Sequence, residues 1–286
     1  MLAEQTIENP LTIDEFVMIR DLLYKKSGMF FPENKKYYLE PKIVKRMEAL
    51  NFPSFLEYLR FLESGQNNQN EWGILFDEIT INETFFFRDQ PQLEAFEKHI
   101  LVPLIEARKN SDNKQIRIWS AACSTGEEPL TLAIILLANL KIFARTFDIR
   151  ITATDISKKA LEMAKKGVYS KRAIQYVPGD YLNKYFTPLQ DGHFKIKDTV
   201  KDLVKYSFAN LRDKSHLSLL PSQDVIFCRN VLIYFDNPVR KEVIKNLYNK
   251  LNPSGYLFTG LSESLFNISN DFKLIFFNRA KAYKKD

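Results

Sequence analysis

The stretch IRIWSAACSTGEEPLTLAIILLANL, from Ile116 to Leu140, decides the fold class of this chain. It opens with a short run of β-branched and aromatic residues, continues through small polar residues, and closes with an apolar run from Leu132. This order predicts a buried β-strand, a tight loop and a buried helix that starts near Glu127. A strand, a loop and a helix in this order form the repeating unit of an α/β sheet.

The same alternation continues to the C-terminus. Four further runs have strand character, namely IRITATD from Ile149, VKYSFANL from Val204, DVIFC from Asp224 and GYLFTGL from Gly255. Helices are expected from Ser157 and from Asp236 with Pro238. This pattern predicts a mostly parallel, Rossmann-like sheet that is covered on both faces. The tail FKLIFFNRAKAYKK turns around Asn278 and Arg279 and predicts an antiparallel hairpin at the sheet edge.

One segment, residues 167–201, interrupts the alternation. It holds too many Tyr, Pro, Gly and Lys residues for a single crossover helix. The runs GHFKI from Gly192 and LVKYS from Leu203 indicate a small antiparallel β-subdomain inserted into the sheet domain. The alternative interpretation is an ordinary long crossover.

The N-terminal part has the signals of a helical domain. Thr12 with Glu15 and Ser54 with Glu57 are capping-box pairs, and Gly28 is a left-handed helix stop. The predicted inner faces are Phe16, Ile19, Leu22 and Leu23 on a first helix, and Leu39, Ile43, Met47 and Leu50 on a second helix from Lys35 to Leu50.

Further signals complete the domain division. The polar stretch GQNNQN from Gly65 predicts a loop, followed by a helix with Trp72, Leu75 and Phe76, and Pro91 opens a long amphipathic helix. We therefore expect a helical domain with its linker over residues 1–90 and a sheet domain over residues 91–286, with the β-subdomain at 167–201.

Composition limits the compartment and the partners. The net charge of +6 allows an anionic partner without selecting one. Cys123 and Cys228 lie in or beside apolar runs, which favours buried thiols and a reducing cytoplasm. The N-terminus lacks a leader pattern and no run is long enough to cross a bilayer, so neither export nor membrane insertion is expected. His99, His193 and His216 are scattered, so no metal site is expected.

The ends of the first two strands suggest a ligand. Residues 120–129 are mostly small and lead into a helix N-terminus, but Gly126 is their only glycine, which disfavours a dinucleotide loop. Asp155 ends the second strand, where a carboxylate can accept hydrogen bonds from ribose hydroxyls. The alternative role of Asp155 is the N-cap of the next helix. A ribose-binding acid without a phosphate loop fits S-adenosylmethionine.

Four motifs resemble the signatures of the CheR chemoreceptor methyltransferases and stand in that family's order. They are NETFFFR from Asn82, STGEEP from Ser124, ATDI from Ala153 and FCRNVLIYFD from Phe227. The resemblance runs from about Leu11 to the C-terminus. It implies a class I methyltransferase sheet with an N-terminal all-helical domain and a small inserted antiparallel β-subdomain.

The resemblance also implies a set of cofactor-binding residues, with S-adenosylhomocysteine as the product of the bound cofactor. The set comprises Asn82, Thr84, Arg88, Glu127, Asp155, Asn210, Leu211, Arg229 and Asn230. The alternative is that Asn82 and Thr84 cap a helix and that Arg229 pairs with a surface carboxylate.

The implied reaction is O-methylation of receptor glutamates for chemotactic adaptation. A glutamate side chain has a reference pKa of about 4.3 and is already an anion at neutral pH, so no general base is required. An enclosed site then contributes mainly alignment. Arg88 is expected to steer the acceptor carboxylate, and Tyr234 to orient it or to line the methyl group.

The resemblance implies that a basic helix docks on the cytoplasmic methylation helices of receptors. Here Lys35, Lys42, Lys45 and Arg46 form a basic ridge beside the apolar stripe of the second helix. The alternative is a solvated face balanced by nearby glutamates. The connection from Thr187 to Gly192 is short and has one glycine, whereas peptide-binding family members have a longer, glycine-richer loop, so binding of a receptor C-terminal peptide is not expected.

Two other functions remain open from the residues alone. A methyltransferase-like domain can sense S-adenosylmethionine or a nucleotide without turnover, although the presence of both Arg88 and Tyr234 argues against this. A nucleic-acid methyltransferase would suit the isoelectric point near 9.0, but no nucleic-acid module is recognisable, so no such partner is expected. We expect a monomeric enzyme.

Overall fold

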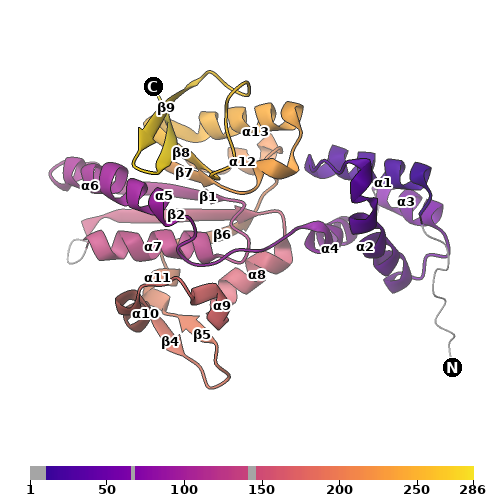
Figure 1. The fold of residues 1–286 in the computed structure, drawn as a ribbon, viewed down its shortest axis with the longest axis horizontal. Helices are drawn as coiled ribbons and strands as arrows, with labels where there is room; N and C mark the ends of the chain where they lie inside the picture. The colour runs from indigo at the N-terminus through magenta and orange to yellow at the C-terminus, as the bar shows by residue number, and fades with distance from the viewer. Residues whose placement is uncertain (1–10, 66–67, 141–145) are drawn as a thin grey trace.

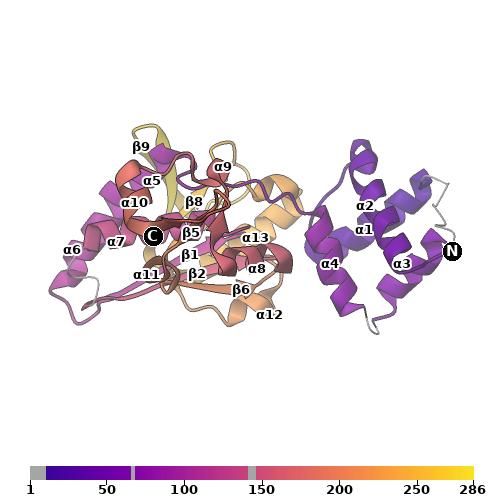
Figure 2. The same cartoon turned by 90° about the horizontal axis from the view of Figure 1, so that it is seen from below.

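The computed structural model describes residues 11–65, 68–140 and 146–286. Figures 1 and 2 show a helical lobe at one end of a larger sheet domain, with an extended linker between them. The linker follows α4 and carries residues 80–89 toward α5.

Four α-helices form the N-terminal lobe: α1 (Ile13–Ser27), α2 (Lys36–Ala49), α3 (Phe55–Glu63) and α4 (Gln69–Ile79), with a 3-10 turn, η1 (Glu33–Lys35), before α2. The capping box at Thr12 is present, Ser54 accepts a hydrogen bond from the Glu57 N–H, and Gly28 ends α1 at φ 82°. The predicted inner faces are buried except for Leu50, which is 38% exposed because α2 ends one residue earlier. The polar loop after Gly65 lies partly outside the described residues.

Seven strands form the main sheet in the order β6-β2-β1-β7-β8-β10-β9. Their bounds are β1 (Gln115–Ala121), β2 (Asp148–Asp155), β6 (Val204–Phe208), β7 (Gln223–Cys228), β8 (Leu251–Thr259), β9 (Phe272–Phe277) and β10 (Ala280–Lys285). The first five strands pair in parallel, and the C-terminal hairpin pairs antiparallel, as predicted. Strand order reverses between β1 and β7, which is where such sheets bind their ligands.

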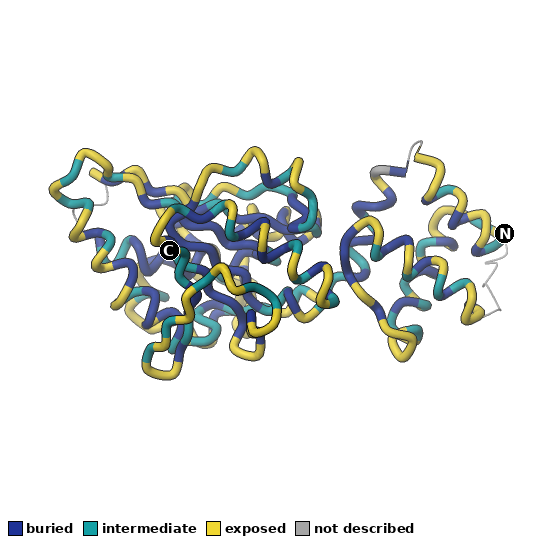
Figure 3. The backbone as a smooth tube through the Cα atoms, turned by 90° about the horizontal axis from the view of Figure 1, so that it is seen from above, coloured by how far each residue is buried: buried dark blue, intermediate teal, exposed yellow. Residues whose placement is uncertain are grey.

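Helices cover both faces of the sheet. Their bounds are α5 (Gln90–Phe96), the π-helical turn η2 (Glu97–Leu101), α6 (Val102–Lys109), α7 (Glu127–Leu140), α8 (Lys158–Lys166), α12 (Lys214–Ser218) and α13 (Asn237–Lys250). Ile116 and Ile118 of β1 pack into one core with α5 to α7, whereas Trp119 and Ala121 point to the opposite face and pack with α13. Figure 3 shows the strands as the most continuously buried part of the chain.

The inserted subdomain is a separate three-stranded antiparallel sheet, ordered β3-β5-β4. Its elements are β3 (Val168–Tyr169), α9 (Lys171–Ile174), α10 (Gly179–Tyr185), β4 (Phe186–Pro188), β5 (Phe194–Ile196) and α11 (Asp198–Lys201). The predicted pairing of GHFKI with LVKYS is wrong. LVKYS contains β6, which pairs with β2 of the main sheet, and β5 instead pairs with β3 and β4.

The C-terminal end of α1 joins the two lobes. Met29 forms an antiparallel bridge with Phe235, and the Phe30 N–H donates to the Tyr234 carbonyl at 2.9 Å. Gly28 allows this approach, because a Cβ at its position would lie 2.9 Å from Val239 Cγ1. The helical lobe and the α13 face of the sheet share one hydrophobic cluster, so the two lobes pack against each other.

Within the described ranges, no helix is both long and apolar enough to cross a membrane.

Candidate cofactor and active site

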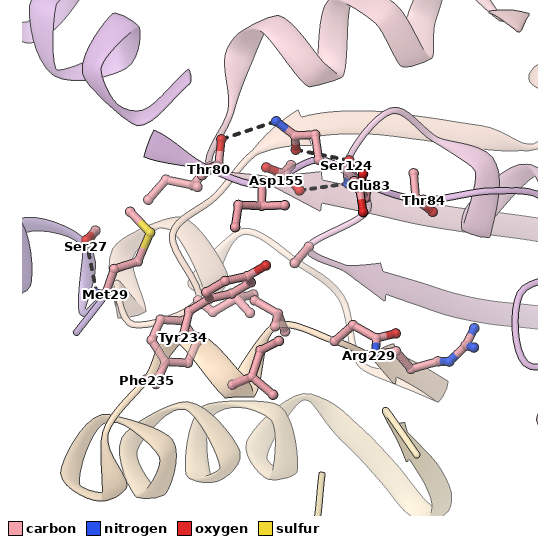
Figure 4. A pocket seen from close by; sticks show the side chains of 18 of the residues that line it. Ser27, Met29, Thr80, Glu83, Thr84, Ser124, Asp155, Arg229, Tyr234 and Phe235 are labelled. Atoms are coloured by element: carbon pink, nitrogen blue, oxygen red, sulfur yellow. Dashed lines mark hydrogen bonds between the residues drawn. The ribbon is translucent and has the colours of Figure 1, made fainter. Parts of the chain in front are cut away.

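A pocket of about 710 Å³ lies between the helical lobe and the carboxyl ends of the strands. The linker, the loops after β1, β2, β6 and β7, and the end of α1 all contribute to its wall. Figure 4 shows Asp155, Ser124 and Thr84 on one side of this space and Tyr234 and Met29 across from them. The pocket therefore occupies the position that the reversal of strand order predicts.

Asp155 lines the pocket and is not a helix cap. Ser157 caps α8, and the Asp155 carboxylate accepts one hydrogen bond at each oxygen, from the N–H groups of Ser157 and Ser124, both at 2.8 Å. A carboxylate has about four acceptor positions, so each oxygen keeps capacity for a ligand hydroxyl. Burial raises the pKa of this carboxyl, against the lowering effect of its backbone hydrogen bonds.

The loop between β1 and α7 brings its backbone close to the pocket. Ala122 (φ 63°), Ser124 (φ 48°) and Gly126 (φ 94°) all lie in the left-handed region. Such conformations cost free energy in Ala and Ser and gather at functional sites. At Gly126 a side chain is excluded, since a Cβ would lie 2.8 Å from the Ala164 Cβ. This loop presents backbone and small side chains to a ligand.

The linker forms the wall of the pocket beside this loop. Asn82 donates from its amide to Thr80 at 3.2 Å and accepts a hydrogen bond from the Ser124 hydroxyl at 3.0 Å (Figure 4). Thr84 also lines the pocket. Neither residue caps a helix, because α5 begins only at Gln90 with Asp89 as its N-cap. Asn82 instead connects the linker to the loop between β1 and α7 through its hydrogen bond with Ser124.

Arg229 lies in a buried charge network rather than at the surface. Its guanidinium contacts Asp89 at 2.6 Å and Glu128 at 3.1 Å, and it donates to the Arg88 carbonyl at 2.9 Å. Burial raises the pKa of Glu128, while the Arg229 charge and the Ser120 hydroxyl lower it. Arg229 Nε is buried without a hydrogen-bond partner among the described residues. The network fixes the backbone that carries Arg88.

The two neighbouring acids of the loop have different surroundings. Glu128 lines the pocket, whereas Glu127, which the sequence favours as a cofactor ligand, is absent from the lining and bonds to the Thr125 hydroxyl at 2.6 Å. Burial raises the pKa of Glu127. Residues one apart on a helix point about 100° apart around its axis, which explains the difference. Glu128, which lines the pocket, and Asp89, which pairs with Arg229, are among the polar residues here that the motif analysis did not assign to the site.

Asn210, Leu211 and Asn230 line the pocket. Asn210 also donates to the Lys26 carbonyl at 3.0 Å and so joins the sheet to the end of α1. Asn230, two residues after the end of β7, takes a left-handed conformation with φ 59°. All three thus occupy the ends of strands, where the sequence places them.

Arg88 and Tyr234 approach the pocket from different elements, the linker and the 3-10 turn η4 (Leu232–Tyr234). Arg88 bonds to the Glu83 carbonyl at 3.2 Å and its guanidinium lies 5.7 Å from the Phe85 ring centre. Burial raises the pKa of Tyr234, and the positive charge of Arg88 lowers it. Both side chains are half-buried, so an acceptor entering the pocket can reach them.

The basic ridge is largely neutralised within the helical lobe. Arg46 forms a buried two-point ion pair with Glu71, at 2.9 and 2.6 Å. Its charge is therefore not available to contact a receptor. Lys45 pairs with Glu78 at 3.0 Å, and the Lys42 amine donates to the Glu78 carbonyl and lies over the Tyr38 ring. Lys35 is exposed at the pocket edge. Of the four residues, Lys35 and Lys45 are the most accessible.

No group of three or more His, Cys, Asp or Glu side chains able to hold a metal ion occurs in the part of the chain that the structure describes. Cys123 and Cys228 are buried free thiols, as the sequence predicts.

Two family models match the chain. One, described as the S-adenosylmethionine-binding domain of CheR methyltransferase, matches residues 82–281, and the other, its all-alpha domain, matches residues 14–80. Together with the strand-end carboxylate and the pocket at the reversal of strand order, these matches place the chain among the S-adenosylmethionine-dependent methyltransferases.

Curated relatives match over nearly the whole chain. Chemotaxis protein methyltransferase 2 of Vibrio cholerae is 36% identical over 278 residues, covering 96% of this chain and 94% of the relative. The chemotaxis protein methyltransferases of Borreliella burgdorferi and Salmonella typhimurium are 35% and 31% identical, covering 89% and 96% of this chain and 89% and 92% of the relatives. The chain belongs to the CheR family of chemotaxis protein methyltransferases, which are protein-glutamate O-methyltransferases.

Proposed function

We propose that the pocket aligns S-adenosylmethionine with a glutamate side chain on a cytoplasmic methylation helix of a chemoreceptor. The observation that carries this proposal is a single pocket with a ribose-type carboxylate, Asp155, on one wall and the pair Arg88 and Tyr234 at another. An anion-steering cation beside a half-buried phenol suits a carboxylate acceptor.

The residues around Asp155 fit an adenosine ligand. Ile156 and Leu211 are apolar neighbours for a flat base, while the Asp155 oxygens keep acceptor capacity for ribose hydroxyls. Arg229 lines the pocket, and its Nε is a buried donor without a partner among the described residues. We assign cofactor contacts to Asn82, Thr84, Arg88, Asp155, Asn210, Leu211, Arg229 and Asn230, and an indirect role to Glu127 behind the loop.

The chain's own residues then supply alignment and exclusion of water. The cofactor contributes a methyl group on a positive sulfur. Arg88 holds the acceptor carboxylate by a charge-assisted hydrogen bond, and the Tyr234 phenol, which is protonated at neutral pH, donates a second one. The apolar residues Met29, Phe31 and Ile79 limit water on the helical side of the pocket.

Receptor approach is proposed across the exposed rim of the pocket. Phe30, Ile81 and Ile233 are large apolar side chains that are about half exposed there, and Lys35 provides a positive charge. An amphipathic helix with acidic side chains matches this combination. We further propose that the enzyme acts as a cytoplasmic monomer on receptors, without nucleic-acid or receptor-tail binding.

The test uses labelled methyl donor and a panel of receptor cytoplasmic fragments. Transfer should give a base-labile ester that releases methanol, which methyl groups on nucleobases do not. Arg88→Ala should lower kcat at saturating cofactor and receptor by about tenfold or more, because a lost steering charge acts on reactive geometry. Lys98→Ala, which removes a cation from an exposed pair with Glu94 on the sheet domain, serves as the control. Base-stable product, or unchanged kcat in Arg88→Ala, would reject these assignments.

A further inference from the structure

Glu263 is a buried carboxylate to which the proposed reaction assigns no role. It follows β8 in a turn closed by a hydrogen bond from its own N–H to the Gly260 carbonyl, and the residue is only 5% exposed. Within the described ranges its carboxylate makes no ion pair, and its partners are backbone N–H groups. Burial of a carboxylate costs free energy, and here hydrogen bonds from backbone N–H groups compensate for the lost hydration.

The carboxylate joins the loop after β8 to the loop after β7. Its Oε2 accepts hydrogen bonds from the N–H groups of Gly260 at 2.6 Å and Asn230 at 2.9 Å, and its Oε1 accepts one from Ile233 at 3.2 Å. Two of these three donors therefore belong to the segment from Asn230 to Tyr234, which lines the pocket.

That segment has a conformation that requires external acceptors. Asn230 is left-handed and Val231 is the N-cap of η4, so the N–H groups at the start of this turn, Ile233 among them, have no partner within it. The Glu263 carboxylate satisfies the Ile233 N–H in the turn and the Asn230 N–H before it with charge-assisted hydrogen bonds. Without Glu263, the Asn230 and Ile233 N–H groups would lose their acceptor.

Gly260 shows how closely the two loops are packed. A Cβ at this position would lie 2.7 Å from Glu263 Oε2 and 3.0 Å from the Asn230 nitrogen. Only glycine leaves room for the carboxylate between the two backbones. The loop after β8 and the loop after β7 therefore meet at the Glu263 carboxylate.

We propose that Glu263 is a positioning residue for methyl transfer, which holds the segment from Asn230 to Tyr234 so that Tyr234 faces the acceptor carboxylate. The inference rests on the proposed role of Tyr234. Glu263 also acts through its charge: after burial and Arg88, it is a further influence on the pKa of Tyr234, which it raises.

The test is a double-mutant cycle with Glu263→Gln and Tyr234→Phe on the full chain. Glu263→Gln puts an NH₂ group against one of the backbone donors, so kcat should fall about tenfold or more, and S-adenosylmethionine affinity, to which Asn230 also contributes, should fall by a smaller factor. If Glu263 acts through Tyr234, the double variant should be no slower than the slower single variant. Glu162→Gln, an exposed acid on α8, is the matched control.

A second variant separates misplacement from misfolding. Gly260→Ala displaces the carboxylate without removing it and should reproduce the loss of kcat, with the thermal midpoint recorded for each protein. Additive losses in the double variant, or full kcat in Glu263→Gln when Tyr234→Phe is impaired, would overturn the inference and leave the proposed function intact. Full activity of Tyr234→Phe would remove the assigned role of Tyr234 and this inference together.

Discussion

The two walls of the pocket differ in how their charged and polar side chains are paired. On the sheet side, the Asp155 oxygens keep unused acceptor capacity, and the Arg229 Nε is a buried donor without a partner among the described residues. On the helical side, Arg46 and Lys45 are paired with acids of α4, and the residues facing the pocket there include Met29 and Ile79. The sheet domain is thus equipped to bind a polar ligand, whereas the helical lobe closes the space by apolar contact.

We expect the largest effect from Arg46→Ala, which tests whether Arg46 stabilises the helical lobe. Arg46→Ala would leave the Glu71 carboxylate buried with the Tyr58 hydroxyl at 2.8 Å as its one remaining side-chain partner among the described residues. Loss of one member of a buried ion pair costs about 3 to 5 kcal/mol, which chemical denaturation should detect.

Lys45→Ala is the matched control for Arg46→Ala, since it breaks an exposed pair with Glu78 that is worth about 0.2 to 1 kcal/mol. If Arg46→Ala were as stable as the parent but bound receptor fragments weakly, Arg46 would be a docking residue after all.

The next effect tests the sheet wall. Asp155→Ala should weaken S-adenosylmethionine binding by at least about tenfold, because it removes charge-assisted hydrogen bonds worth on the order of 2 to 4 kcal/mol in total. Calorimetry measures the affinity directly, and Asp148→Ala, which alters an exposed acid at the other end of β2, is the control. Equal affinities for all three proteins would exclude Asp155 as the ribose ligand.

Cofactor affinity should also depend on pH through Asp155. The ionised carboxylate is the form that accepts ribose hydroxyls, and burial raises its pKa. Affinity should therefore be full above the raised pKa and decline as the pH falls through it, starting at a higher pH than for an exposed aspartate. Titrations between about pH 8 and pH 5 should show this decline in the parent. Asp155→Asn should bind weakly with little change over the same range, and parallel curves for the two proteins would contradict the assignment.

Local signals made much of the fold predictable. The capping box at Thr12, the stop at Gly28 and the helix start at Asp236 act through neighbours in sequence. The strand-helix alternation placed Asp155 at a strand end, and the motif resemblance added Arg229 and Asn230. These predictions needed no knowledge of how distant segments meet.

The sequence did not determine which distant residues and segments pair with one another. Arg46 meets an acid 25 residues away, and the strand of the insertion that contains Phe194 pairs with two short segments, one of which lies before α9. Asp89 and Glu263 carry no local pattern that marks them, since their roles arise only when the linker and the loop after β8 reach β7. The choice between Glu127 and Glu128 likewise depends on the rotation of α7 about its axis.

The smallest expected effect tests what remains of the basic ridge. Lys35, Lys42 and Lys45 can contribute to receptor approach by weak, screened attraction, each contact being worth about 0.2 to 1 kcal/mol. Reversal of Lys42 and Lys45 to Glu would place new negative charges beside Glu78, so replacement by Gln is the cleaner change. We expect Lys42→Gln with Lys45→Gln to lower kcat/KM for receptor fragments about twofold to tenfold at low salt, and Lys35→Gln to do so as well.

Kinetics at two salt concentrations distinguish docking from a solvated face. The parent should slow toward the variants as salt rises, since screening removes the attraction that the variants already lack. Lys98→Gln removes the same charge from the sheet domain and should behave as the parent. Cofactor affinity should be equal in all of these proteins, because Asp155 and its loop are unchanged. If the lysine variants match the parent at low salt, the ridge only solvates the helical lobe, and receptor recognition must then depend on the apolar rim around Phe30 and Ile233.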